Sequence, residues 1–111
     1  MRFNMESLKE KTLPQLVLLN KKEQHKVYQV TGTAGTSMPE HISTKEAVVI
    51  IQEGEVVLNI QNQNYNLKKN DVFIIPAEVK HFLSIGKDFK AVVIMDIDSQ
   101  IEIYKLIRRL K

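Results

Sequence analysis

From about residue 15 onward, the chain is built from short runs of β-branched and aliphatic residues that are separated by Gly, Asn, Asp and Pro. Short apolar runs bounded by turn-forming residues are typical of an antiparallel β-sandwich or barrel. In the run 56–60, Val56, Leu58 and Ile60 alternate with Val57 and Asn59, as in a half-buried strand. The sequence therefore predicts an all-β domain. Its predicted strands are 16–19, 27–31, 47–51, 56–60, 65–67, 72–75, 80–85 and 89–97.

Turn-forming residues mark the connections between these runs. We expect a loop at 32–37, a turn at 53–55, a hairpin tip at 61–64, and further turns at 69–71 and 86–88. Each of these segments carries Gly, Asn or Asp, which tolerate the backbone conformations that turns require.

The length of 111 residues suits one compact domain. We expect an N-terminal arm at 1–14, a β-barrel at 15–97 and a C-terminal amphipathic helix at 98–111. Hydrophobic residues make up 43% of the chain, and no apolar run is long enough to span a bilayer. There is no cysteine, which excludes disulfides and thiolate ligands. Residues 1–11 lack the apolar core of a signal peptide, so we expect a cytoplasmic protein without a membrane partner.

The net charge of +3 comes entirely from the end of the chain. Residues 101–111 contain four basic side chains against the single acid Glu102, and the rest of the chain is neutral. Groove binding requires a basic face together with a reading element. We therefore expect no nucleic-acid partner.

The C-terminal segment differs in kind from the rest. Ser99 and Glu102 have the spacing of a capping box, which predicts that a helix begins here. Apolar residues then recur at helical spacing, at positions 103, 106, 107 and 110. Such a helix could bind an anionic surface or pack on the barrel or a partner. We favour packing, because one short helix buries too little surface to anchor a protein.

Three predicted strands are apolar on both faces, at 47–51, 72–75 and 91–95. Strands of this kind are covered on both sides. In a domain this small only one face can look into the core, so the other face meets a second subunit or the terminal segments. We expect a homodimer.

Two histidine segments point to a family. Gly35, His41 and Gly54 have the spacing of the first cupin motif, in which Gly is followed by His-x-His, then Glu, then Gly. The second His of that motif is Ser43 here, and the Glu is Ala47. The region around them resembles the cupin superfamily.

The second motif of the family is matched by Pro76 and His81. Asn70 and Glu78 stand where the motif has glycines, and Ile85 stands where it has Asn. The resemblance covers residues 27–95 and implies a jelly-roll β-barrel, also called a double-stranded β-helix.

Typical cupins bind Fe, Mn, Ni or Zn through three His and one Glu, and the matching positions here retain only His41 and His81. Glu46 cannot replace the missing carboxylate in an unbroken strand, because alternation places it on the opposite face from Ala47. Only a β-bulge would change that. We therefore expect a degenerate metal site and no cofactor. The alternatives are a weakly held divalent ion, or imidazoles hydrogen-bonded to backbone or water.

The same strand parity predicts an apolar pocket around the two imidazoles. Its expected lining is His41, Ser43, Ala47, Val49, Ile51, His81, Leu83 and Ile85. Such a lining suits a non-enzymatic barrel that binds a small organic ligand or an interaction partner. The alternative is a metal-dependent enzyme of the dioxygenase, isomerase or decarboxylase type using His41 and His81. A third possibility is a sensor barrel that works with a separate regulatory partner.

Overall fold

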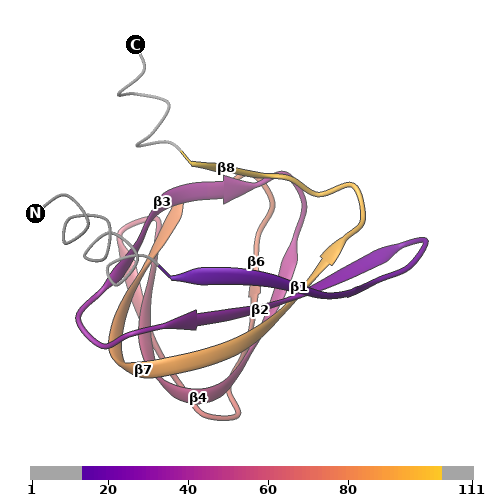
Figure 1. Ribbon diagram of the computed structural model, residues 1–111. Coiled ribbons are helices and arrows are strands. Elements are labelled where there is room, and N and C mark those ends of the chain that lie inside the picture. The colour runs from indigo at the N-terminus through magenta and orange to yellow at the C-terminus, as the bar shows by residue number, and fades with distance from the viewer. Residues whose placement is uncertain (1–13, 104–111) are drawn as a thin grey trace, which may run out of the picture.

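The computed structural model describes residues 14–103, and all of its regular elements are strands (Figure 1). Neighbouring strands run antiparallel throughout the curled sheet. No helix long and apolar enough to cross a membrane occurs between residues 14 and 103. The strands are β1 (Gln15–Lys21), β2 (His25–Gly32), β3 (Ser37–Ser43), β4 (Ala47–Ile60), β5 (Gln63–Lys68), β6 (Val72–Ile75), β7 (His81–Asp96) and β8 (Ile101–Ile103).

The sheet folds into two layers because β4 and β7 are long and bent. The first half of β4 pairs with β6 and with the second half of β7, which continues to β2 and β1. The second half of β4 pairs with β5 and with the first half of β7, which continues to β3 and β8. We call β6–β4–β7–β2–β1 the first layer and β5–β4–β7–β3–β8 the second layer. This arrangement confirms the predicted jelly-roll barrel.

The predicted turns at 53–55 and 86–88 are wrong in one respect, because the chain bends there without reversing. The pairing of β4 with β7 shifts register between Ile51 and Val56, which is the signature of a bulge. Gly54 adopts a φ of 85°, and a Cβ at this position would collide with the backbone of Asp88. The two strands therefore bend together at a point where β4 has no side chain.

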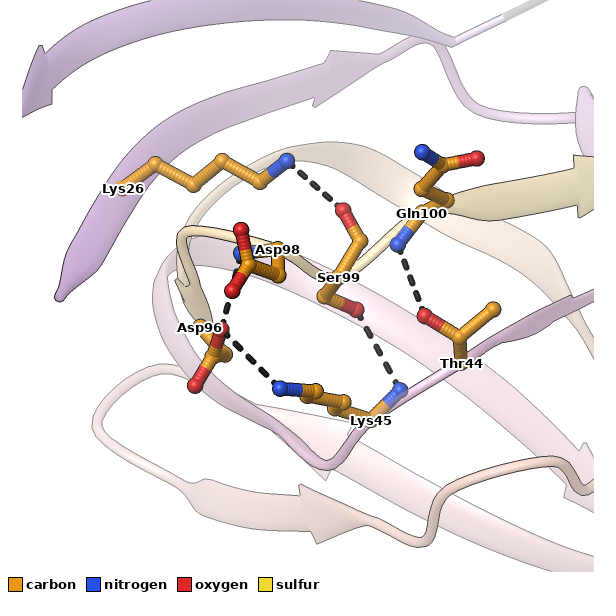
Figure 2. Close-up of polar contacts among 7 residues, drawn as sticks. All are labelled: Lys26, Thr44, Lys45, Asp96, Asp98, Ser99 and Gln100. Atoms are coloured by element: carbon orange, nitrogen blue, oxygen red, sulfur yellow. Dashed lines mark hydrogen bonds and ion pairs between the residues drawn. The ribbon is translucent and has the colours of Figure 1, made fainter.

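The predicted start of a C-terminal helix is also wrong. Ile101–Ile103 forms β8 and pairs with β3, with Ser43 opposite Ile101. Ser99 is buried, and its hydroxyl accepts a hydrogen bond from the Lys45 amide at 3.3 Å (Figure 2). The Gln100 amide donates to Thr44 Oγ1 at 2.9 Å. These long-range partners replace the local ones of a capping box. The rest of the predicted helix, like the predicted arm, lies outside the described residues.

Two further polar contacts hold the same segment in place (Figure 2). Lys26 Nζ donates to the Ser99 carbonyl at 2.7 Å, and Lys45 Nζ lies 3.4 Å from Asp96 Oδ1. The connection between β7 and β8 is therefore tied to both β2 and the turn before β4, which brings β8 against β3.

The core fills the space between the layers. Ile51 and Leu58 on β4 and Ala91 on β7 are each only 1% exposed. Burying an isoleucine or leucine side chain contributes roughly 1.5–3 kcal/mol. Strand β3 lies outside the strand list predicted from the sequence, because Pro39 interrupts its pattern and its pairing with β7 is irregular between Met38 and His41.

Candidate functional site

A cavity of about 60 Å³ lies between the two layers. Most of its lining is apolar, and its polar residues are Tyr28, His41, Ser43 and His81. Tyr28 comes from the first layer, whereas the other three come from β3 and β7 in the second layer. The chemistry of the site is therefore concentrated on one side of the barrel.

The two histidines are direct cross-strand partners. His41 on β3 is paired with His81 on β7, so their side chains leave the sheet on the same face. Their ring centroids are 4.1 Å apart in an edge-to-face arrangement with an interplanar angle of 61°. His41 is 5% exposed and His81 is 4% exposed. The pair is therefore an integral part of the barrel wall.

Each ring is oriented by a backbone carbonyl two residues earlier. His41 Nδ1 lies 2.7 Å from the Pro39 oxygen, and His81 Nδ1 lies 3.0 Å from the Val79 oxygen. A carbonyl oxygen can only accept, so Nδ1 carries the proton in both rings and Nε2 presents a lone pair. Between residues 14 and 103, no fully buried side-chain nitrogen or oxygen lacks a partner. The Nε2 atoms have no hydrogen-bond partner within that span, so they cannot be fully buried. Because both rings line the cavity, we infer that their Nε2 atoms open into it.

Both imidazoles are neutral at physiological pH. Burial, as the largest cause, and the neighbouring His41 together lower the pKa of His81 to about 4, and the bond to the Val79 carbonyl opposes the shift. Burial also lowers the pKa of His41, against the effect of the Pro39 carbonyl. The site therefore offers two uncharged nitrogen acceptors.

Ser43 adds a third acceptor. Its Oγ donates to the Lys45 carbonyl at 3.0 Å, which uses its only hydrogen and leaves the oxygen lone pairs. Ser43 is 3% exposed and lines the same cavity. The histidine side of the cavity thus accepts hydrogen bonds and donates none.

The structure brings most of the predicted pocket residues together. His41, Ser43, Ala47, Val49, Ile51, His81 and Leu83 all line the cavity. Ile85 does not line it and lies in the core just before the bend of β7, where its Cδ1 occupies the space above Gly32. Residues absent from the prediction include Leu16, Tyr28, Met38, Leu67 and Ile101. The only sequence signal for these residues was the alternation that turns every second side chain of a strand inward. Alternation does not say which of the inward side chains reach the cavity.

The residues present do not fit the metal centre of typical cupins. Ala47 supplies no ligand, and Glu46 is exposed in the turn between β3 and β4. In the described part of the chain, no group of three His, Cys, Asp or Glu side chains could hold an ion. Zinc sites in proteins use at least three protein ligands, and non-haem iron uses two His and a carboxylate.

Backbone conformation supports the match to the second cupin motif. Asn70 and Glu78 occupy the glycine positions of that motif, and both have positive φ, 77° and 66°. Asn tolerates this left-handed conformation, whereas Glu adopts it at a cost of roughly 1–2 kcal/mol. The Glu78 amide donates to the Ser43 carbonyl at 2.8 Å, which holds the turn against β3.

Solved structures share this fold at low sequence identity. A cupin superfamily protein from Desulfitobacterium hafniense is 24% identical, with a TM-score of 0.70 over 77% of this chain and 78% of the other. An RmlC-like cupin from Methanocaldococcus jannaschii with a double-stranded β-helix fold is 22% identical, with a TM-score of 0.68 over 77% and 81%. The DMSP lyase DddQ from Ruegeria pomeroyi is 19% identical, with a TM-score of 0.73 over 81% of this chain and 51% of the lyase.

No curated protein is significantly similar in sequence. The cupin domain family matches residues 28–98, which span both histidine segments and most of the barrel. The two motifs, the jelly-roll topology and this match agree, and the chain belongs to the cupin family.

Proposed function

We propose that this cupin is a non-enzymatic barrel that binds a small, neutral, largely apolar molecule carrying a hydroxyl or amino group. The observation that supports this proposal is the polar lining beside the imidazoles, which consists of three hydrogen-bond acceptors, the Nε2 atoms of His41 and His81 and Ser43 Oγ. A ligand binds to these three acceptors by donating hydrogen bonds.

The charge state of the site selects against anions. A carboxylate or phosphate would lose its hydration in an apolar cavity and meet no donor on the histidine side, because both imidazoles are neutral. Burying an unpaired charge costs several kcal/mol even after relaxation. An alcohol, a phenol or an amide meets no such penalty.

The volume of the cavity limits the size of the ligand. At about 60 Å³ it is far smaller than the roughly 300–1,000 Å³ of pockets that hold drug-sized molecules. A ligand of a few non-hydrogen atoms fits without rearrangement. The best tiny ligands gain up to about 1.5 kcal/mol per non-hydrogen atom, so we expect micromolar to millimolar dissociation constants.

The proposal is tested by titrating matched probes, 1-propanol and propionate at pH 7, by calorimetry and thermal shift. We expect propanol to bind and propionate not to bind. His81→Phe should abolish propanol binding, whereas His25→Ala should not change it, because His25 is exposed at the start of β2. Tighter binding of propionate would contradict the proposal, as would an unchanged response to propanol in the His81 variant.

A metal-dependent enzyme is the second candidate. The observation that favours it is that both Nε2 lone pairs open into one cavity, and a lyase is among the structural neighbours. Elemental analysis of protein purified without an affinity tag separates the two candidates. Near-stoichiometric Fe, Mn, Ni or Zn would overturn the proposal of a non-enzymatic barrel.

A further inference from the structure

Tyr28 is the one polar residue that the first layer contributes to the cavity lining, among the residues that the structure describes. It lies on β2 opposite Val93 of β7, which in turn lies opposite Val49 of β4. Both valines line the cavity, and residues that are aligned across neighbouring strands share a face of the sheet. The tyrosine side chain therefore points to the inside of the barrel.

The hydroxyl of Tyr28 forms no hydrogen bond with any residue between 14 and 103. Over the same span every fully buried side-chain oxygen has a partner, so this hydroxyl is not fully buried. The side chain as a whole is half-buried and packs against the core. The Tyr65 hydroxyl, by contrast, donates to Gln63 Oε1 at 2.8 Å and lies outside the cavity lining. The Tyr28 hydroxyl is therefore available to a bound molecule.

This hydroxyl supplies what the second layer lacks. His41 and His81 present Nε2 lone pairs, and Ser43 has already given its hydrogen to the Lys45 carbonyl. All three of these groups accept hydrogen bonds, whereas a phenol hydroxyl has a hydrogen to donate. The remaining described lining is apolar. The cavity therefore has acceptors on the second layer and one donor on the first layer.

We propose that Tyr28 is a specificity-determining residue and that the ligand of this barrel is a small aliphatic primary amide. This inference rests on the proposed function and names the class of ligand for the same cavity. The amide carbonyl accepts a hydrogen bond from the Tyr28 hydroxyl. The amide N–H groups donate to the Nε2 atoms of His41 and His81.

The spacing of the imidazoles favours an amide over an alcohol. The two ring centroids are 4.1 Å apart, and both rings line the same cavity. A primary amide carries two hydrogens on one nitrogen and can donate to both rings, whereas an alcohol has a single hydrogen to donate. An alcohol therefore leaves one acceptor inside the cavity without a partner, which weakens binding.

The rest of the lining sets the other properties of the amide. A carboxylate has a similar shape but carries a charge and has no hydrogen to donate, so it meets neither the imidazoles nor the apolar walls favourably. The aliphatic side chains of Val49, Ile51 and Val93 suit a short alkyl group. A cavity of about 60 Å³ limits that group to very few carbon atoms.

NMR titrations of the full chain with acetamide and with 2-propanol test this inference. The two probes have the same number of non-hydrogen atoms and the same branched shape, but 2-propanol has no carbonyl and a single hydrogen to donate. We expect acetamide to bind the native chain. Tyr28→Phe should raise the dissociation constant of acetamide at least about fivefold, because the carbonyl then faces a ring without a donor. The dissociation constant of 2-propanol should change by less than about twofold in the same variant.

The matched control is Tyr65→Phe, which removes a hydroxyl outside the cavity and should leave both dissociation constants unchanged. Tyr28→Phe keeps the aromatic ring and removes no hydrogen bond within residues 14–103, so its free energy of unfolding in urea should match that of the native chain.

Three results would overturn the inference while leaving the proposed function in place. They are binding of 2-propanol without binding of acetamide, an unchanged affinity for acetamide in Tyr28→Phe, and an equal loss for both probes in that variant. Failure of both probes to bind the native chain would overturn the proposed function and this inference with it.

Discussion

The two layers of this barrel share two strands, yet they differ in what they present. Both turn aliphatic residues inward along β4 and β7. The first layer is also aliphatic outside, whereas the second layer is polar outside and carries the two histidines inside. Inward residues are therefore set by the common core, while outward residues depend on what each layer meets beyond the barrel.

The division also separates two roles. The polar chemistry beside the imidazoles lies on the layer whose outer face suits water. The strands that are apolar on both faces, for which the sequence predicts cover from a second subunit or the terminal segments, lie in the other layer, away from the imidazoles. Changes on one layer should therefore leave the property of the other layer intact, and the predictions below use this separation.

The largest loss of stability should come from a substitution at the bend that joins the layers. Gly54→Ala would force a Cβ into the backbone of Asp88 and place a non-glycine residue at a φ of 85°. We expect the free energy of unfolding to fall by about 3–4 kcal/mol, measured in urea, with both layers affected. Gly35→Ala is the control, because Gly35 has a φ of 88° but nothing within 4 Å of a Cβ. Equal losses in the two variants would contradict the steric explanation.

Acid should destabilise the folded protein through His81 in the second layer. The pKa of His81 is about 4 in the folded protein and 6.5 when unperturbed, so the unfolded chain binds a proton that the folded chain does not between these values. Above about pH 6.5 the His81 ring is neutral in both the folded and the unfolded chain, and the folded state has its full stability. This stability is lost as the pH falls toward 4, because the unfolded chain then binds a proton that the folded chain does not. The loss amounts to about 3 kcal/mol.

This pH dependence is isolated by comparing native protein with His81→Phe in urea titrations across pH 4–7. The difference between the two unfolding free energies should change by about 3 kcal/mol over this range. Carboxylates that titrate in both proteins cancel in the comparison. A constant difference would show that His81 does not titrate in the expected way.

The missing ligands of the cupin centre can be put back. Ser43 and Ala47 stand at the motif positions of His and Glu, and both line the cavity beside His41 and His81. Ser43→His with Ala47→Glu should tighten cobalt or zinc binding at least about a hundredfold, or about 2.7 kcal/mol, measured by calorimetry. The control places the same residues on the outer faces, as Ser84→His with Val48→Glu. Equal metal affinity in both double variants would contradict the assigned positions.

The smallest effect is a gain in stability next to the second layer. Glu78 holds a left-handed conformation, and glycine adopts it without cost. Glu78→Gly should raise the free energy of unfolding by about 1 kcal/mol. Asn70→Gly should gain less, because Asn already tolerates this conformation. A loss of stability in the Glu78 variant would indicate that its side chain makes a stabilising contact.

Much of the fold could be predicted from local pattern. Strand parity and turn residues located most of the strands, and the spacing of Gly35, His41 and Pro76 identified the family. The predictions of local structure were wrong where a local sequence signal competed with contacts to residues far away in the chain. Gly54 looked like a turn but sits in a bulge because β7 bends beside it. Ser99 looked like a helix cap but bonds to the Lys45 amide, 54 residues away in sequence.

The fold class, the family and the types of residue available at the site follow from the sequence alone, because alternation and motif spacing are properties of neighbouring residues. The sequence predicted Glu46 on the strand face opposite Ala47, whereas the structure ends β3 at Ser43 and places Glu46 in the turn before β4. The neutral Nδ1–H tautomers of both imidazoles, which open into one small cavity, depend on contacts that exist only in the folded protein. The folded protein alone shows that the aliphatic outer residues of five strands, β6, β4, β7, β2 and β1, align in two adjacent rows. Cavities, hydrogen-bond partners and surfaces are made by segments far apart in the chain, and their contacts carry no local signal.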